Sequence, residues 1–510
     1  MRAVRFLATL LVTVALLLAQ GASKWVFFGP DRRLQYRLDA HGNRIMDFSF
    51  AGYKGGGVKL PAVAVIKTLS PVAGDNKSAI QTAIDEVSRR APDPSGLRGA
   101  VLLKPGSYEL AGVLTIGAGG VVLRGSGSGE GGTIIKLTGP PHRFLDIRGT
   151  GNWEAVGDST AITDAYVSAG TDSVQAERAT GFRVGDTVLV RRPVTEAWIH
   201  FMGMDTLVRD GKQQTWIKAG TFIRTDRAIQ SISGTRIRLD VPLSDSFDSK
   251  YLNPPGATLV KYTFPGRISE AGVEGLQVVA PSHDAPISEA QYTVLRMEAV
   301  IDAWARDIAV QETQNGITVG AAAKRVTLDG IRIVHTLTHS GAAAPADFSL
   351  SGTQILVNRC SVRGEGTWPV VTQANVTGPI VVLNFSSDER GVAPHQRWAT
   401  GLLVDGATLS NSTERAPGIA FSNRKTAGSG HGWDIGWAVA WNVTSPFLLV
   451  QQPPGAMNWC IGCTGRPVTV AGAPSGIFDS QDAPVAPVSL YLEQLRERLG
   501  DAALANIGYH

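Results

Sequence analysis

Three cysteines are all that this chain of 510 residues contains, and their arrangement argues against a zinc or redox site. Cys460 and Cys463 form a single C-x-x-C pair, and Cys360 stands alone. A zinc site usually has a second such pair, and a redox pair needs a thioredoxin-like βαβ context that the sequence lacks. The pair is therefore interpreted as two small core-filling or disulfide-linked residues.

Charged residues are also scarce, at 18% of the chain, compared with roughly a quarter in an average soluble domain. Hydrophobic residues make up 43% of the chain, and 58 residues are glycine. This mixture supports a sizeable core and favours strands and tight turns over helices. The net charge is +4, and without residues 1–22, which hold Arg2 and Arg5 but no acid, it falls to near +2. So small a charge implies neither a nucleic-acid partner nor a membrane partner for the mature form.

Long apolar runs are missing except at the start of the chain. The run from Phe6 to Leu18 follows Arg2 and Arg5, and it is shorter than the roughly 20 residues that span a membrane. Ala19 and Gly21 supply the small residues of a cleavage site. Residues 1–22 are therefore predicted to be a signal peptide rather than a membrane anchor, and the mature protein is expected to be secreted or periplasmic.

One helix stands out near the N-terminus, in the predicted lead-in of residues 23–152. Residues 76–90 place Ile80, Ala83, Ile84 and Val87 on one apolar stripe. The following segment, AVLLKPGSYEL, is typical of two strands joined by a Pro-Gly turn.

A second pattern recurs later in the chain: a short apolar strand, then Asp or Asn, then another short strand. Five such units begin at Val326, Ile355, Ile380, Leu402 and Trp437, roughly 22 to 35 residues apart, which is the spacing of solenoid repeats. Asp and Asn tolerate the left-handed conformation of a sharp corner. We therefore expect a stacked row of corner residues made of Asp329, Asn358, Asn384, Asp405 and Asn442. This assigns a structural role to Asp405, which would otherwise be a candidate catalytic carboxylate.

The run GDNKSAIQTAIDEV, followed by GAVLLKPGSYELAGVLTI, resembles the N-terminal cap and first coils of the pectate-lyase-like (pectin lyase fold) superfamily. The resemblance implies an all-β fold, namely a right-handed parallel β-helix whose open end is closed by an N-terminal capping helix. Residues 153–266 interrupt the repeat and are predicted to form a β-rich insertion. Residues 267–475 are predicted to form the main β-helix. Residues 476–510 are predicted to form a tail whose helix carries Leu490, Leu492, Leu495 and Leu499 at helical spacing.

Three polar, aromatic-rich segments carry the candidate site: PHQRWATG, FSNRKTAGSGHGWDIGW and QQPPGAMNW. Together they resemble a secreted bacterial branch of the same superfamily, which supplies no firm reaction to carry over. Because each segment adjoins a coil strand, we expect them to line one groove that fits a polysaccharide. The predicted substrate-binding residues are Trp398, Trp433, Asn458 and Trp459, although tryptophans of this kind often serve only in packing.

The chemistry of these segments suits a polysaccharide lyase acting on a uronic acid by β-elimination. His431 is the candidate base and His395 the second proton-transfer group. Arg397 and Arg424 are candidate clamps for the sugar carboxylate, and Asn423 can stabilise the enediolate. Glycines 428, 430 and 432 are expected to leave room for close approach of the ligand to His431.

Two alternatives stay open. A glycoside hydrolase needs two opposed carboxylates, and Glu365, Asp388, Glu389 and Asp434 are available, although no paired-acid motif stands out. The fold also suits a non-catalytic carbohydrate-binding protein or adhesin. No cofactor and no metal are expected. Calcium could replace arginine in neutralising the carboxylate, but no cluster of aspartates has the spacing of a calcium site.

Overall fold

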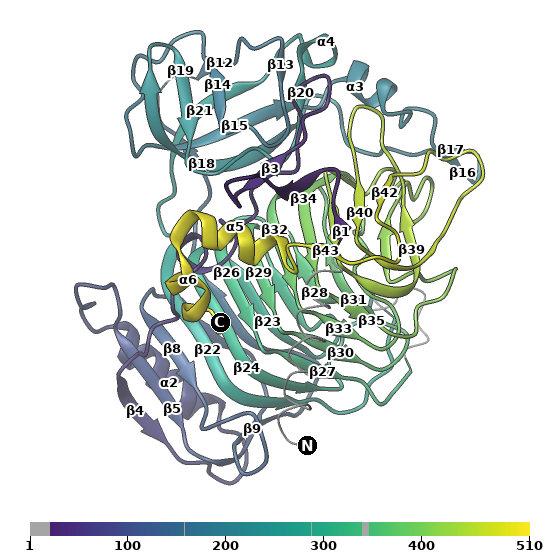
Figure 1. The fold of residues 1–510 in the computed structure, drawn as a ribbon. Coiled ribbons are helices and arrows are strands. Elements are labelled where there is room, and N and C mark those ends of the chain that lie inside the picture. Colours follow the sequence, from purple (N-terminus) through teal and green to yellow (C-terminus); the bar gives the residue numbers. More distant parts are fainter. Residues whose placement is uncertain (1–20, 158, 287, 339–345) are drawn as a thin grey trace, which may run out of the picture.

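The computed structural model describes residues 21–510 apart from 158, 287 and 339–345, and it is mostly β with few helices, as predicted (Figure 1). The predicted signal peptide falls almost entirely on residues 1–20, which lie outside the described residues. Gly21 and Ala22 form β1 (Gly21–Ala22), which pairs with β43 (Val485–Ala486) near the other end of the chain. A short antiparallel hairpin follows, formed by β2 (Val26–Phe28) and β3 (Leu34–Tyr36).

Long parallel sheets form the body of the molecule. The first sheet consists, in order, of β4 (Val65–Leu69), β5 (Gly99–Leu103), β8 (Val121–Arg124), β22 (Ile268–Val279), β24 (Val300–Gln311), β26 (Lys324–Asp329), β29 (Thr353–Asn358), β32 (Thr377–Leu383), β34 (Ala399–Asp405), β38 (Val439–Trp441), β40 (Trp459–Ile461) and β42 (Ile477–Asp479). Every neighbouring pair is parallel. Strands that lie far apart in the sequence can therefore place their ends in one row.

Two further parallel sheets accompany the first. The second contains β6 (Gly106–Leu110), β9 (Thr133–Leu137), the C-terminal parts of β22 and β24, β27 (Arg332–Val334), β30 (Ser361–Arg363), β33 (Ser386–Ser387), β35 (Thr408–Leu409), β39 (Thr444–Val450) and β41 (Thr464–Pro467). The third contains β7 (Leu114–Ile116), β10 (Arg143–Arg148), β23 (Thr293–Glu298), β25 (Ile317–Val319), β28 (Ala346–Leu350) and β31 (Trp368–Thr372). In the central part of the chain, each successive turn places one strand in each of the three sheets before the chain returns to the first sheet. We call the three parallel sheets together the stack.

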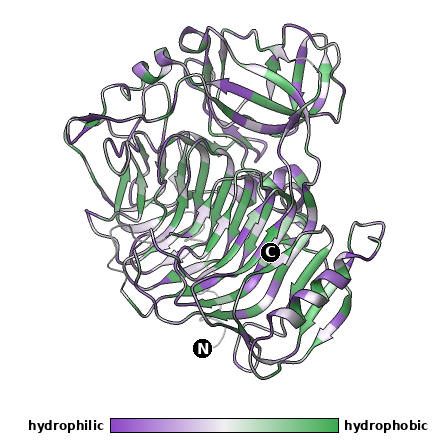
Figure 2. Cartoon of the chain, turned by 180° about the vertical axis from the view of Figure 1, so that it is seen from behind, coloured by the Kyte–Doolittle hydropathy of each residue, from purple (hydrophilic) through white to green (hydrophobic). Residues whose placement is uncertain are grey.

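Apolar side chains from all three sheets meet in one core. Figure 2 shows that the strands of these sheets are predominantly hydrophobic, and residues such as Val326, Ile355, Ile380 and Leu402 are at most 1% exposed. The three cysteines are free and buried, and all belong to this core, in agreement with a core-filling role. Val326, Ile355, Ile380 and Leu402 occupy matching positions on neighbouring strands, which lie about 4.8 Å apart in a parallel sheet.

The corner row is partly different from the prediction. Asn384 and Asn442 are left-handed, with φ of 50° and 49°. Asp329, Asn358 and Asp405 instead end their strands, and each is followed by the left-handed residue, which is Gly330, Arg359 or Gly406. The prediction was wrong by one position in these three coils. In two of them a glycine, Gly330 or Gly406, adopts the corner conformation without steric cost and leaves the preceding Asp in the strand. In the third coil Arg359 itself is left-handed.

The predicted N-terminal helix is α2 (Lys77–Ser88). Its buried residues are Ile80, Ala83, Ile84 and Val87, as the apolar stripe predicts, and they belong to the same core as the strands. Figure 1 shows the helix beside β5 and β8 at one end of the stack. The preceding segment holds the short 3-10 helix η1 (Tyr53–Gly55).

Residues 154–263 include an antiparallel sheet that stands apart from the stack (Figure 1), and we call this segment the insertion. It is formed by β11 (Glu154–Ala155), β12 (Thr160–Ala161), β14 (Ser173–Gln175), β15 (Thr187–Pro193), β18 (Phe222–Ser233), β19 (Arg236–Leu239) and β21 (Thr258–Thr263). Two small pairs accompany it, β13 (Tyr166–Val167) with β20 (Phe247–Asp248) and β16 (Val208–Arg209) with β17 (Lys212–Gln213). The helices α3 (Glu196–Phe201) and α4 (Ser249–Leu252) belong to the same region.

The chain ends in α5 (Leu490–Leu499) and α6 (Asp501–Asn506). Leu490 and Leu495 are fully buried, whereas Leu499 is 46% exposed. The N-terminus of α5 covers Asp405, whose Oδ2 accepts hydrogen bonds from Ser489 Oγ at 2.7 Å and from the Tyr491 backbone N–H at 2.8 Å. Asp405 is therefore a buried structural carboxylate and not a catalytic one.

Candidate functional site

Four of the five predicted catalytic residues meet at one place on the stack. His395 and Arg397 precede β34, and Arg424 and His431 lie in the loop between β36 (Ile419–Phe421) and β37 (Ile435–Gly436). The rings of His395 and His431 touch edge to face, with centroids 4.6 Å apart. The Arg397 backbone N–H donates to the His431 carbonyl at 3.0 Å, and Arg424 Nη1 donates to the His395 carbonyl at 2.7 Å. The two loops therefore hold these residues together, and we call them the His/Arg cluster.

Burial and positive charge keep both imidazoles of the His/Arg cluster neutral at neutral pH. Burial, followed by the charges of Arg424 and Arg397, lowers the pKa of His395 to about 4. The pKa of His431 is also lowered to about 4, by burial first and then by His395 and the two arginines. His431 is 8% exposed, and its Nδ1 makes no hydrogen bond within the part of the chain that the structure describes. Such an imidazole can accept a proton beside a bound anion.

Neither arginine of the His/Arg cluster forms an ion pair with an acid among the described residues. Arg397 Nη2 donates to Ser429 Oγ at 2.6 Å, and the guanidinium of Arg424 lies 5.9 Å from the centre of the Trp368 ring. Asp434 acts electrostatically on Arg424 without forming an ion pair with it, so both guanidinium groups can still attract an anionic ligand.

Asn423 and the three glycines do not fit the predicted arrangement. Asn423 Oδ1 accepts a hydrogen bond from the Lys425 backbone N–H at 2.9 Å, and Asn423 lines a cavity that does not include the His/Arg cluster. A β-carbon on Gly428 would collide with the His431 ring, and one on Gly432 would collide with Trp216. The expectation that these glycines leave room for a ligand was wrong, because protein side chains already occupy that space.

The four predicted substrate-binding residues are all buried. Trp398, Trp433, Asn458 and Trp459 are exposed by 2%, 4%, 0% and 1%. The Asn458 side chain donates to the Gln451 carbonyl at 2.9 Å and accepts from the Ala438 backbone at 3.0 Å. The prediction of exposed sugar platforms was wrong, because these indoles are packed against protein side chains, although Trp398 and Trp433 each contribute to the lining of a cavity. The rings hold the insertion and the stack together in one apolar cluster.

The carboxylates considered for a hydrolase have structural roles. Asp434 is fully buried, accepts hydrogen bonds from Ser422, and has its pKa raised by burial. Asp388 and Glu389 accept backbone N–H groups of Gly364 and Gly366. These three side chains brace the loops and do not face one another across a cavity. Glu365 is exposed on the loop that they brace.

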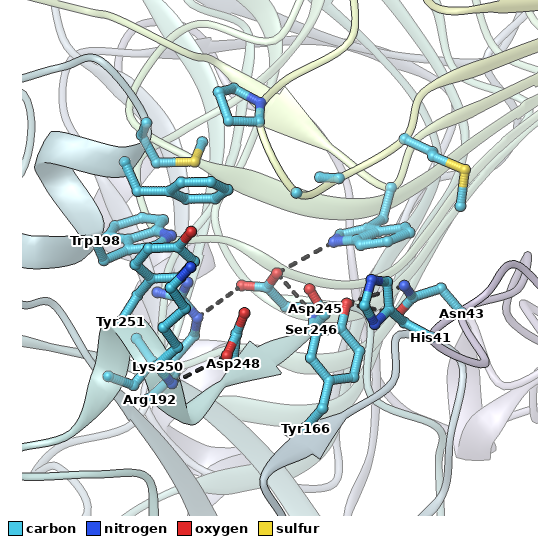
Figure 3. Close-up of a pocket in the computed structure, with 18 of the residues that line it drawn as sticks. His41, Asn43, Tyr166, Arg192, Trp198, Asp245, Ser246, Asp248, Lys250 and Tyr251 are labelled. Atoms are coloured by element: carbon cyan, nitrogen blue, oxygen red, sulfur yellow. Dashed lines mark hydrogen bonds and ion pairs between the residues drawn. The ribbon is translucent and has the colours of Figure 1, made fainter.

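A cavity lies between the insertion and the stack, and the sequence did not predict it. Its volume is about 540 Å³. Figure 3 shows Trp198, Arg192 and Tyr251 on one side, Tyr166, His41 and Asn43 on the other, and Asp245 with Ser246 between them. The rings of Phe201 and Tyr251 stack at the rim, with centroids 4.0 Å apart. The lining residues are Asp39, His41, Asn43, Tyr166, Arg192, Trp198, Phe201, Met202, Asp245, Ser246, Asp248, Lys250, Tyr251, Leu252, Trp398, Trp437, Gln452, Pro454, Gly455, Ala456 and Met457. We call it the insertion cavity.

Asp245 is the centre of a hydrogen-bond network in the insertion cavity. Its carboxylate accepts from the indole N–H of Trp398 at 2.9 Å and of Trp437 at 3.2 Å. Arg192 Nε lies 3.3 Å from Asp245 Oδ2, and the Arg192 guanidinium stacks on Trp198 at 4.0 Å from the ring centre. Burial lowers the pKa of Arg192. The network joins β15 of the insertion to loops of the stack and fixes the shape of the cavity.

A second cavity of about 450 Å³ adjoins the first. Met202, Gln452, Pro454 and Gly455 line both cavities. Its far side is formed by residues such as Asn423 and Lys425, which adjoin Arg424 of the His/Arg cluster in the sequence. The two cavities thus form one extended depression along the junction of insertion and stack.

Sequence reasoning missed the insertion cavity because its residues come from segments 39–43, 166–252 and 398–457, which carry no shared motif. The one available signal was the run rich in Trp, His and Met after Pro193, which stood out in composition. Among the described residues there is no group of three or more His, Cys, Asp or Glu side chains that could hold a metal ion. Within the same residues, no helix has the length and apolar character needed to cross a membrane.

Comparison with known proteins finds distant structural neighbours only. No family profile matches the sequence, and no curated protein matches it either. The chain is similar to the tailspike protein gp49 of Pseudomonas phage LKA1, with 13% identity and a TM-score of 0.43, over 77% of this chain and 64% of that one. It is also similar to the gp54 tailspike of Acinetobacter baumannii bacteriophage AP22, solved with A. baumannii capsular saccharide, with 9% identity and a TM-score of 0.37, over 77% and 51%. A mutant tailspike of E. coli bacteriophage HK620 in complex with a pentasaccharide gives 11% identity and a TM-score of 0.41, over 91% and 70%.

This chain therefore spans less than two thirds of the length of the first two neighbours. At this level of similarity, function has to be argued from the chain's own side chains.

Proposed function

We propose that the protein is a polysaccharide-active enzyme, a lyase that cleaves a uronic-acid-containing glycan by β-elimination at the His/Arg cluster. The observation that carries this proposal is the contact of two neutral imidazoles, His395 and His431, beside two arginines that form no ion pair with an acid among the described residues. Such a group combines a base with the positive charge that a uronate carboxylate requires.

The proposed reaction assigns one step to each part of the cluster. Arg397 and Arg424 neutralise the sugar carboxylate, which acidifies the neighbouring C–H. His431 removes that proton, the electron pair forms the new C=C bond, and the C–O bond to the next sugar breaks. The leaving oxygen takes up the proton that His431 has removed, which passes to it through His395, so both imidazoles end the cycle neutral. A bound carboxylate also offsets the arginine charges that lower both histidine pKa values, so His431 becomes a stronger base when substrate is present.

The proposed function is joined to a proposed fold type and a proposed location in the cell. We infer that the three parallel sheets form a right-handed β-helix of the pectate-lyase-like kind, with α2 as its cap and residues 153–266 as an insertion. The protein would act in the periplasm or outside the cell after removal of residues 1–22.

Because arginine supplies the positive charge, we expect activity to survive treatment with a calcium chelator. Loss of activity that added calcium restores would contradict this assignment.

A glycoside hydrolase is the second candidate, because Asp39, Asp245 and Asp248 all line the insertion cavity. A hydrolase would use two of them across a glycosidic bond. The oxygens of Asp245 already accept from Trp398, Trp437 and the Ser246 backbone N–H, which makes Asp245 a poor proton donor. The lyase is therefore the better supported of the two.

The test is incubation with a panel of uronic-acid polysaccharides, with ultraviolet-absorbing unsaturated ends and reducing ends measured together. A lyase raises both signals in equal number. Reducing ends without unsaturated ends would indicate the hydrolase. Retention on a polysaccharide column without either signal would indicate a binding protein.

The pH profile gives a separate prediction. The base must be unprotonated, and its pKa in the free protein is about 4, so kcat/KM should be constant near neutral pH and fall as the pH drops through about 4. The acid limb of kcat should lie at higher pH, because the bound carboxylate raises the pKa of His431. Steady-state rates across the pH range check this. An acid limb of kcat/KM at or above the ordinary histidine value of 6.5 would contradict the role of the cluster.

A further inference from the structure

We infer that the insertion cavity is a subsite for an uncharged sugar ring, so that the ligand is a heteropolysaccharide in which uncharged residues neighbour uronic acids. This inference deepens the proposed function and rests on it for the position of the uronate at the His/Arg cluster. The binding of the uncharged ring is argued from the cavity alone.

The rim of the cavity has the composition of a sugar platform. Phe201 and Tyr251 form a stacked pair there, and both are only half-buried. Trp198 and Arg192 continue the wall inward and are each 4% exposed. An aromatic wall with a few fixed polar groups is the usual character of a small-ligand site, and a sugar ring offers an apolar face and hydroxyl groups that match it.

Arg192 supplies an unused donor inside the cavity. Its charge is already balanced by Asp245 at 3.3 Å, and stacking on Trp198 fixes its orientation. Its Nη1 is buried and makes no hydrogen bond within the described part of the chain. A buried donor without a partner is costly, and a neutral acceptor such as a hydroxyl or acetamido oxygen would satisfy it without adding a second negative charge.

The charge of the cavity favours an uncharged ring over a uronate. Asp39, Asp245 and Asp248 outnumber Arg192 and Lys250, which leaves one negative charge in excess. Carboxylates accept hydrogen bonds from sugar hydroxyls but repel another carboxylate.

The opposite end of the depression is positive. Lys425 lines the second cavity, and Arg424 is its neighbour in the sequence. Asp434 is the acid whose charge acts on Arg424, and burial raises its pKa. One ligand that follows the depression from the insertion cavity toward the His/Arg cluster would therefore meet negative and then positive surroundings. A glycan with both uncharged and acidic residues matches this change, whereas a polymer of uronic acid alone does not.

The experiment measures dissociation constants by calorimetry in the full-length mature protein carrying His431→Ala, which prevents turnover. The probes are oligosaccharides of equal length: a set that alternates a uronate with an N-acetylhexosamine, and an oligogalacturonate. Tyr251→Ala removes part of the platform, and Asp248→Asn removes one charge while keeping a side chain able to cap α4, where Asp248 Oδ1 accepts the Lys250 N–H. Phe27→Ala is the matched control, because this exposed aromatic residue lines neither cavity.

We expect at least one alternating oligosaccharide to bind more tightly than the oligogalacturonate. Tyr251→Ala should weaken its binding about tenfold, Asp248→Asn several-fold, and Phe27→Ala not at all. The protein with Asp248→Asn should bind the oligogalacturonate at least as tightly as the protein that carries His431→Ala alone. Equal binding of both probe types, absence of binding, or binding that is indifferent to Tyr251 and Asp248 would overturn the inference.

The proposed function is judged separately, by unsaturated ends formed by the wild-type protein. Binding that depends on Tyr251, without formation of unsaturated ends, would contradict the proposed lyase activity and support the subsite. Cleavage of a polyuronate at a rate that Tyr251→Ala does not change would support the lyase activity and contradict the subsite.

Discussion

Replacing His431 with alanine should lower kcat/KM on a uronic-acid polysaccharide by about two to four orders of magnitude, the usual loss on removal of a general base. His431 is the better placed of the two histidines, because its Nδ1 has no partner among the described residues, whereas His395 Nδ1 lies 3.2 Å from Gln373 Oε1. The rate of formation of unsaturated ends measures the effect.

The fold should survive the change. The hydrogen bonds of His431 come from its backbone and not from its ring. Its carbonyl accepts from Arg397 of the other loop at 3.0 Å, and its N–H donates to Ala427 within its own loop at 3.1 Å. His142→Ala is the control, since His142 directly precedes β10 and lines neither the insertion cavity nor the second cavity. An unchanged rate in His431→Ala, with an unchanged circular dichroism spectrum, would remove His431 from the mechanism.

Replacing Asp405 with asparagine should remove a pH-dependent part of the stability. Burial raises the pKa of Asp405 from its ordinary 3.8 to about 7, against the lowering effect of its hydrogen bonds with Tyr491 and Ser489. The group therefore stabilises the folded state fully below about pH 4, and this contribution is lost as the pH rises through about 7. The wild-type free energy of unfolding should fall by about 3 kcal/mol from this group between about pH 5 and about pH 8.

In Asp405→Asn this fall should be absent, since the amide oxygen can still accept from Ser489 and Tyr491 but carries no charge. Denaturant unfolding at the two pH values gives the comparison. Asp329→Asn is the matched control, because Asp329 occupies the same row of strand ends and pairs with the exposed Arg359 at 2.8 Å. Equal pH dependence in wild type and Asp405→Asn would show that the N-terminus of α5 does not bury a charge at Asp405.

The repeated pattern of strand, Asp or Asn, and strand predicted the strands well, but it predicted the corner residues only in part. Units such as VTLDGIRIV do form one strand on each side of a corner, here β26 and β27. The sequence pattern could not tell which of two adjacent residues turns, because Asp329 and Gly330 both suit a corner, and the choice depends on the register with the neighbouring coil.

The candidate site shows the same division. Proximity in sequence and residue chemistry were enough to select His395, Arg397, Arg424 and His431, which the structure brings together. The same reasoning misassigned Trp398 and Trp459, because an aromatic residue beside polar neighbours looks the same whether its ring faces solvent or the core. No local pattern indicated that Arg192, Asp245 and Tyr251 would form a cavity with Trp437.

By itself, the sequence determined the mostly β character, the apolar stripe of α2 and the recurrence of short strands, because each of these follows from local periodicity and backbone preference. Only the tertiary structure decided which side chains are exposed, that α5 buries Asp405, and that the insertion and the stack enclose a cavity between them. Burial and distance between remote segments depend on how the whole chain packs, and the hydrophobic effect that drives this packing is not directional. Local patterns therefore fix the elements, while their packing fixes the sites.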